Sequence, residues 1–229
     1  MNIIVDNLGY ILSGAAATVR LAALALVFAL ALGAIAGLLR LYAPPPLRIL
    51  SVAYIELFCG TPVLVQMFFI FFGLPLLLGW NVSAFTAASL ALVLNNGAYF
   101  AEITRGGMQA VPREQWSAGL ALGLSFRQVL TAIVVPQAIR RIIPPAVGQF
   151  TILVKDTSIA SAIGFFEMTR AGQHVVERTL APFEIFTLVG MLFFLVCYAG
   201  SSASRRLERH LARAGAVGEG AWRYVFGAR

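Results

Sequence analysis

The chain has 229 residues, of which 59% are hydrophobic and only 12% are charged, and it carries a formal net charge of +7. A soluble domain of this length normally has about twice that charged fraction, so the composition excludes an ordinary water-soluble protein and predicts a membrane protein. The positive charge does not indicate nucleic-acid binding, because it is confined to short loops and the C-terminal tail, as the positive-inside rule describes.

The apolar stretches predict an all-α membrane protein with about five transmembrane helices, since a helix needs about 20 apolar residues to cross a bilayer. Gly33 and Gly37 in the first stretch have the GxxxG spacing that favours close helix packing. The pair Arg140 and Arg141 sets the expected start of the fourth helix. The expected spans are residues 19–39, 62–78 (entered from a helix that contains 54–58), 85–103, 142–163 and 183–203.

The arginines sort consistently along these spans. They follow the first span, separate the third from the fourth, and follow the fifth, whereas the turn at Trp80 has no charge and the loop 164–182 is balanced. By the positive-inside rule the N-terminus lies outside and the C-terminus is cytoplasmic. We expect one transmembrane domain over 1–229, with a basic cytoplasmic tail over about 204–229.

The segment between the third and fourth spans is soluble-looking and helix-forming, and we take a loop over about 106–136. Gly123 would let the chain turn sharply between two short helices, because glycine tolerates a positive φ. Trp116 and Leu120 have the helical spacing of one face. Such an element suits docking to a partner protein; the alternative is an amphipathic helix that lies on the bilayer.

Lys155 is the only lysine, and Asp156 follows it, so the chain lacks the Gly-Lys-Ser/Thr of an ATP-binding P-loop. Any ATP hydrolysis must belong to another subunit. Neither the histidines, His174 and His210, nor the cysteines have a metal-ligand spacing, and no catalytic constellation is found.

Ionisable groups inside a membrane line a cavity or pair with each other. We expect Lys155 to meet a substrate α-carboxylate and Asp156 to receive an α-ammonium or to cap a broken helix; the alternative is a structural pair buried between subunits. Polar groups expected at similar depth could complete a small pocket for a zwitterion, although helix packing explains any single amide as well. These groups are Gly60, Thr61, Asn95, Asn96, Gln149 and Thr157.

Four motifs resemble the permease subunits of bacterial ABC-type importers, in the branch for polar amino acids such as histidine, glutamine and glutamate. The loop has the family spacing from Ser117-Ala118-Gly119 through Gly123 to Ile133-Val134-Val135-Pro136, although Ser117 replaces the usual Glu and Gly119 an Ala. The other motifs, which extend the resemblance over about 14–211, are Tyr54–Pro62 (with Cys59 for the usual Arg), Asn95–Glu102 with Arg105-Gly106-Gly107, and Lys155–Ile159.

The resemblance implies the type I ABC importer permease fold and a transport subunit rather than an enzyme. It implies an inner-membrane assembly with an ATPase dimer that holds ATP and Mg, a second permease, and an external solute-binding protein. The substrate would be a polar amino acid, and neutral Gln149, where relatives often carry a carboxylate, favours an uncharged or acidic one. The implied coupling to the ATPase runs through the part of the loop over 111–126, by the residues Glu114, Gln115, Trp116, Ser117, Ala118, Gly119, Leu120 and Gly123.

Two other classes account for less of the chain. A channel or ion-coupled transporter explains the spans and the intramembrane charges, but it does not explain the loop around Gly123, and it predicts transport without ATP. A membrane-bound enzyme would need paired carboxylates or a His/Ser arrangement, and both histidines lie outside the expected spans.

Overall fold

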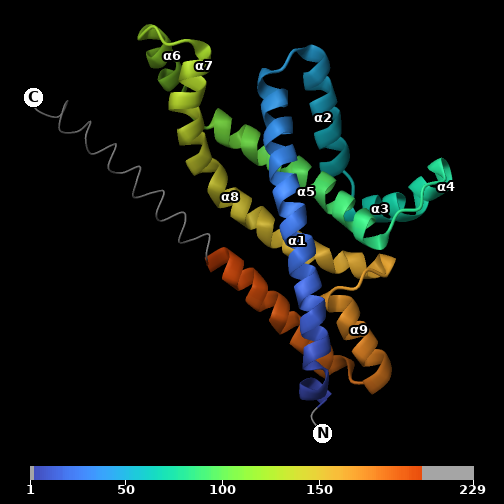
Figure 1. Ribbon diagram of the computed structural model, residues 1–229. Helices are drawn as coiled ribbons and strands as arrows, with labels where there is room; N and C mark the ends of the chain where they lie inside the picture. Colours follow the sequence, from blue (N-terminus) through green and yellow to red (C-terminus); the bar gives the residue numbers. More distant parts are fainter. Residues whose placement is uncertain (1–2, 203–229) are drawn as a thin grey trace, which may run out of the picture.

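The computed structural model describes residues 3–202, and this part of the chain is built from helices (Figure 1). The turns η1 and η2 are π-helical, and η3 is a 3₁₀ helix. In chain order the elements are α1 (Ile3–Tyr42), α2 (Pro45–Cys59), α3 (Val63–Phe68), η1 (Phe69–Gly73), α4 (Leu74–Leu78), α5 (Ala84–Gln109), α6 (Arg113–Ala121), α7 (Phe126–Gln128), η2 (Val129–Val134), α8 (Val135–Asp156), η3 (Thr157–Ile163), α9 (Met168–Thr179) and a last helix, Pro182–Ser202.

The expected class and number of spans are confirmed. Four helices of the described part are long and apolar enough to cross a membrane, and α2 with α3–α4 forms a fifth candidate that is bent by 103°. Figure 1 shows α6 and the α1–α2 connection at one end of the molecule, and the N-terminus and α9 at the other. The arginine-rich connections that the sequence assigned to the cytoplasm therefore share one end. The basic tail over 204–229 lies outside the described residues.

Two expected boundaries were wrong. The fourth helix does not begin at residue 142, because it runs without interruption from Phe126 to Ile163. Arg140 and Arg141 are exposed on its surface, where charged side chains do not oppose helix formation. The expected loop 164–182 contains the amphipathic helix α9, whose buried residues have helical spacing: Met168, Ala171, Gly172 and Val175.

The helix α5 lies at the centre of the packing, with α1 as its largest neighbour and with α2, α3 and α8 also in contact. Small residues make this possible, because α5 buries Ala87, Ala88 and Ala91 without large side chains holding its neighbours apart. The expected close packing at the GxxxG pair is confirmed. A Cβ atom on Gly33 would lie 2.4 Å from the Cβ of Phe100, and one on Gly37 would lie 2.7 Å from the carbonyl oxygen of Ala101.

At the end of the molecule away from α6, the buried carboxyl of Glu167 joins α9 to α1 (Figure 1). Glu167 is fully buried, and its carboxylate accepts a hydrogen bond from the backbone N–H of Arg170 at 2.7 Å, which caps α9. Thr18 of α1 accepts from the N–H of Met168 at 3.1 Å and donates to Glu167 at 3.4 Å. Burial raises the pKa of the Glu167 carboxyl above its usual range, because desolvation disfavours the charged form.

We expect Gly33→Leu to lower the stability of the folded chain by about 1–3 kcal/mol, because α1 must move away from α5 to make room for the side chain. Gly9→Leu is the matched control on the same helix, since a Cβ at Gly9 has no neighbour within 4 Å. The measurement is the thermal unfolding midpoint in mild detergent. Equal midpoints for the two variants would contradict the close packing of α1 and α5.

Candidate functional site

The break between α2 and α3, at Gly60–Pro62, is the structural origin of the polar site. Pro62 has no backbone N–H, so the carbonyl of Phe58, four residues earlier, loses its normal helical partner. Two side-chain amides replace that partner: Asn95 Nδ2 donates to Phe58 O at 2.9 Å, and Gln66 Nε2 donates to the same oxygen at 3.1 Å. The break is therefore satisfied by side chains from α5 and α3.

Side chains also satisfy other polar groups around the break. The hydroxyl of Thr61 donates to Leu57 O at 2.7 Å, and Gln66 Nε2 reaches Thr61 O at 3.0 Å and Thr61 Oγ1 at 2.8 Å. Tyr54 of α2 donates to Leu94 O of α5 at 2.7 Å. Irregular backbone at membrane depth is tolerated only where it faces protein or a cavity, and here it does both.

A cavity of about 300 Å³ opens beside the break, and we call it the amide pocket. It brings together four of the residues predicted from the sequence: Thr61, Asn95, Gln149 and Asp156. Thr61 lies in the break and Asn95 in α5, whereas Gln149 and Asp156 lie in α8. Its full lining is Thr61, Pro62, Val63, Asn95, Tyr99, Gln149, Ile152 and Asp156.

A buried amide pair fixes one wall of this pocket. Gln149 Nε2 of α8 donates to Asn96 Oδ1 of α5 at 2.8 Å, and Asn96 Nδ2 donates to Leu92 O at 3.1 Å. Gln149 is 7% exposed and Asn96 is fully buried. The pair sets the rotation of α8 against α5, and with it the position of Asp156 two turns further along α8.

The structure separates Lys155 from the amide pocket. Lys155 lies on an exposed part of α8 and lines a second pocket, the lysine groove, with residues of the last helix. Thr157 also faces elsewhere: it is fully buried, and its hydroxyl donates to Val154 O at 2.7 Å. The groove is lined by Lys155, Gly190, Phe193, Phe194, Cys197, Tyr198 and Ser201.

The loop after α5 contains the expected turn at Gly123. Its φ is +80°, the left-handed region that favours glycine, and the N–H of Leu124 closes the end of α6 on Gly119 O at 3.2 Å. The helix after the turn is not short, because it is the start of the run from Phe126 to Ile163. The family motif has Ala where this chain has Gly119, and the structure gives a local reason for the glycine. A Cβ atom at this position would lie 2.8 Å from Val129 Cγ2.

The two apolar residues of α6 have different surroundings. Trp116 is half-buried and stacks on Phe126, with the ring centroids 5.3 Å apart, whereas Leu120 is 50% exposed. The outward surface of α6 is therefore mostly polar and small. Its exposed members among the predicted coupling residues are Glu114, Gln115, Ser117, Ala118 and Leu120, and Gly123 in the turn is exposed as well.

An ionic cluster joins α1 to α5 near the same end. Glu102 pairs with Arg40 of α1 and with Arg105 of α5, the latter at 2.7 Å. Arg105 also donates through Nη1 to Gln109 Oε1 at 2.6 Å. This cluster holds the ends of α1 and α5 together, where the chain enters the α6 loop.

Gln66 and Tyr99 belong to the site although the sequence patterns did not predict them. Tyr99 lines the amide pocket, and its hydroxyl donates to Cys59 O at 3.5 Å. Gln66 is 8% exposed and makes the bonds at the break. A signal was present for Gln66, because a lone amide in an apolar run, four residues after a proline, is a candidate partner for backbone groups that the proline leaves unpaired.

Residues 29–213 match the protein family described as the binding-protein-dependent transport system inner membrane component. The chain is 36% identical to the glutamine transport system permease protein GlnP of Escherichia coli (strain K12), over 88% of this chain and 92% of that protein. It is also 36% identical to the L-cystine transport system permease protein TcyB of Bacillus subtilis (strain 168), over 86% of this chain and 84% of that protein.

Solved structures share the fold. The chain is similar to the crystal structure of an amino acid ABC transporter with histidines, at 32% identity and a TM-score of 0.86, over 90% of this chain and 96% of that one. An inward-facing structure of the MetNI methionine ABC transporter matches with a TM-score of 0.76, over 88% of this chain and 96% of that one. The second match is 17% identical and supports the fold alone.

We expect the buried amide pair to couple energetically. In a double-mutant cycle with Gln149→Leu and Asn96→Leu, each single change leaves one buried amide without its partner, so the coupling energy should reach about 1 kcal/mol or more. The control cycle uses Gln137→Leu and Gln115→Leu, because the long 3.5 Å contact from Nε2 of half-buried Gln137 to Oε1 of exposed Gln115 should couple negligibly. The measurement is thermal unfolding in detergent. Additive effects in the first cycle would contradict the amide bond.

Proposed function

The chain belongs to the family of binding-protein-dependent transport system inner membrane components, and we propose that it is the transmembrane subunit of an ATP-driven importer that carries polar amino acids across the inner membrane. The observation that carries the proposal is the amide pocket, a polar cavity at a helix break inside a chain whose relatives include glutamine and cystine permeases. The chain is a transport subunit and not an enzyme.

The chemistry of the amide pocket suits a zwitterion. Asp156 would receive the α-ammonium group, while the hydroxyl of Thr61 and the amides of Asn95 and Gln149 offer neutral hydrogen-bonding partners. Gln149 is held by Asn96 and carries no charge, which favours an uncharged or acidic side chain in the substrate. Gly60 contributes by opening the backbone at the break, and Asn96 and Thr157 act from behind the lining.

The lysine groove adds a second polar position at the other side of α8. Among residues 3–202, the Lys155 ammonium makes no hydrogen bond or ion pair, and an unpaired cation in an apolar span calls for a partner from outside the chain. A substrate carboxylate that passes along α8 or a second permease subunit would supply it. Because its ammonium group lacks a partner within the described residues, we include Lys155 in the substrate pathway.

Coupling to ATP would take place at α6 and the turn after it. The exposed surface of α6, from Glu114 to Leu120, projects from the end of the molecule where the arginine-rich connections gather (Figure 1). Trp116 and Gly119 would hold α6 on the spans, so that a movement of α6 reaches α8 directly through η2. The ATPase dimer would hold ATP and Mg, and a second permease and an external solute-binding protein would complete the assembly, with the N-terminus outside and the C-terminus cytoplasmic.

We expect Asp156→Asn to lower amino-acid uptake about tenfold or more in the reconstituted transporter, because hydrogen bonds to charged groups contribute about 1.5–3 kcal/mol. The same exchange at exposed Asp6, outside both pockets, is the control and should leave uptake unchanged. Lys155→Ala is the companion variant: it should lower uptake while assembly stays intact. Normal uptake by the Asp156 variant would rule out the pocket as the substrate site.

We expect Gly123→Val to uncouple or release the ATPase. A non-glycine residue in the left-handed region costs about 1–2 kcal/mol, which corresponds to a factor of roughly 5–30 in the population of the native turn. Gly148→Val is the control, since Gly148 has an ordinary helical backbone and no neighbour within 4 Å of a Cβ. The readouts are co-purification of a P-loop ATPase and its substrate-stimulated activity. Undiminished coupling in the Gly123 variant would refute the role of the loop.

A further inference from the structure

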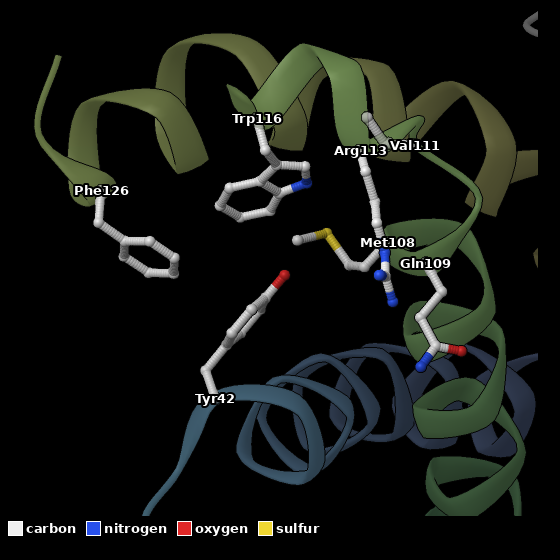
Figure 2. A pocket seen from close by; sticks show the side chains of 7 residues that line it. All are labelled: Tyr42, Met108, Gln109, Val111, Arg113, Trp116 and Phe126. Carbon is white, nitrogen blue, oxygen red and sulfur yellow. The ribbon is translucent and has the colours of Figure 1, made fainter. Parts of the chain in front are cut away.

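A pocket of about 460 Å³ lies where the ends of α1 and α5 meet α6, and neither the substrate pathway nor the outward surface of α6 uses it (Figure 2). We call it the interface pocket. It is formed by the end of α1 and by the segment that runs from the end of α5 to the start of α7. Its lining is Tyr42, Met108, Gln109, Val111, Arg113, Trp116 and Phe126.

The walls of the interface pocket are aromatic and apolar. Trp116 and Phe126 stack with their ring centroids 5.3 Å apart, and the ring of Tyr42 meets Phe126 edge-on at 6.0 Å. Met108 and Val111 are only 4% and 3% exposed, and they close the apolar side of the pocket. This wall would accept hydrocarbon or a glycerol backbone.

The polar groups of the pocket are a cation and hydrogen-bond donors. Among residues 3–202, the guanidinium of Arg113 makes no ion pair and no hydrogen bond. Gln109 uses its amide oxygen to accept from Arg105 Nη1 at 2.6 Å, which leaves its amide nitrogen as a donor. Figure 2 shows the amide nitrogen of Gln109 below the Arg113 guanidinium, on the side of Tyr42, and the Tyr42 hydroxyl pointing toward Trp116 and Met108.

The nearby carboxylates do not neutralise this pocket. Glu102 is held between Arg40 and Arg105, and Glu114 is exposed on α6 and does not line the pocket. The free charge is therefore positive, and it stands beside an apolar wall. An anion with an apolar part has the complementary chemistry, and a guanidinium binds phosphate through two parallel hydrogen bonds.

The level of the pocket relative to the bilayer distinguishes between possible anions that have an apolar part. Tyr42 is the last residue of α1 and lies two residues beyond Arg40, and tyrosine and tryptophan concentrate at the headgroup level of a bilayer. Figure 2 shows the Trp116 side chain on the side of α6 that faces α1 and α5, toward the membrane spans. A cytoplasmic protein would approach α6 from its other side.

We propose that the interface pocket binds the phosphate headgroup of an anionic phospholipid of the inner leaflet. Arg113 holds the phosphate, with Gln109 and Tyr42 as further donors, and the lipid backbone lies against Trp116, Phe126 and Met108. Basic pockets between membrane helices on the cytoplasmic side bind anionic headgroups in this way. The lipid then fills the space under α6. This proposal rests on the proposed function for the cytoplasmic placement of α6.

The test is native mass spectrometry of the full chain, purified in mild detergent and titrated with phosphatidylglycerol. The variant is Arg113→Gln, and Arg127→Gln is the matched control, because Arg127 is an exposed arginine of α7 outside the pocket. Loss of one charge-assisted contact should lower lipid retention about tenfold in the first variant and leave the second like the native chain. Equal losses in the two variants would show only general surface attraction and would overturn the proposal.

Two further arms identify the source of the phosphate. Excess inorganic phosphate should not displace phosphatidylglycerol, since it makes no contact with the apolar wall; displacement would assign the pocket to free phosphate and overturn the lipid. A photo-reactive residue in place of exposed Ala110, used in membranes, should capture phospholipid; capture of the ATPase instead would overturn it as well. Lipid retention requires neither ATPase nor transport, so its failure is distinguishable from failure of the proposed function.

Discussion

The carbonyl of Phe58 needs a hydrogen-bond partner that the backbone cannot give, and the rest of the site is arranged around this requirement. A bilayer core offers no water, so an unpaired backbone group there costs several kcal/mol. Pro62 removes the normal donor, and Asn95 and Gln66 replace it. The bend between α2 and α3 is thereby tied to α5. The hydrogen-bonding groups that stabilise the break also line or border the amide pocket, so under the proposed function stability and substrate recognition would share residues.

The packing around α5 extends the same arrangement through the molecule. Gly33 and Gly37 let α1 approach α5 closely, and the α5 amides reach the break on one side and α8 on the other. The hydrogen bond between Gln149 and Asn96 then fixes α8 against α5. Asp156 lies at the C-terminal end of α8. At the other end, η2 leads into α8 and contacts α6 at Gly119. The amide pocket and α6 are thus both attached to one continuous helical run, Phe126–Ile163.

Sequence alone predicted the features that depend on a local rule. The turn at Gly123, the close approach at Gly33 and Gly37, and the gathering of Thr61, Asn95, Gln149 and Asp156 follow from glycine geometry and from the cost of polar groups in an apolar span. Prediction from the sequence failed where a helix boundary or the direction of a side chain depended on contacts or exposure. Arg140 and Arg141 are on the surface and do not end a helix, and α9 is stabilised by packing on α1. Lys155 and Asp156 are neighbours in sequence, but α8 turns them into different pockets.

The two π-helical turns have a consequence for how such a chain can change over evolution. Phe69–Gly73 and Val129–Val134 each end two residues before a proline, Pro75 and Pro136, and a π turn equals one residue inserted into an α-helix. Deleting one residue from the second turn would restore a regular helix, but it would rotate everything after it by about 100°. Gln149 and Asp156 would then leave the side of α8 that faces α5. Between residues 129 and 134, the number of residues is therefore a structural requirement in its own right, beside the packing of the buried side chains of Val129 and Val134.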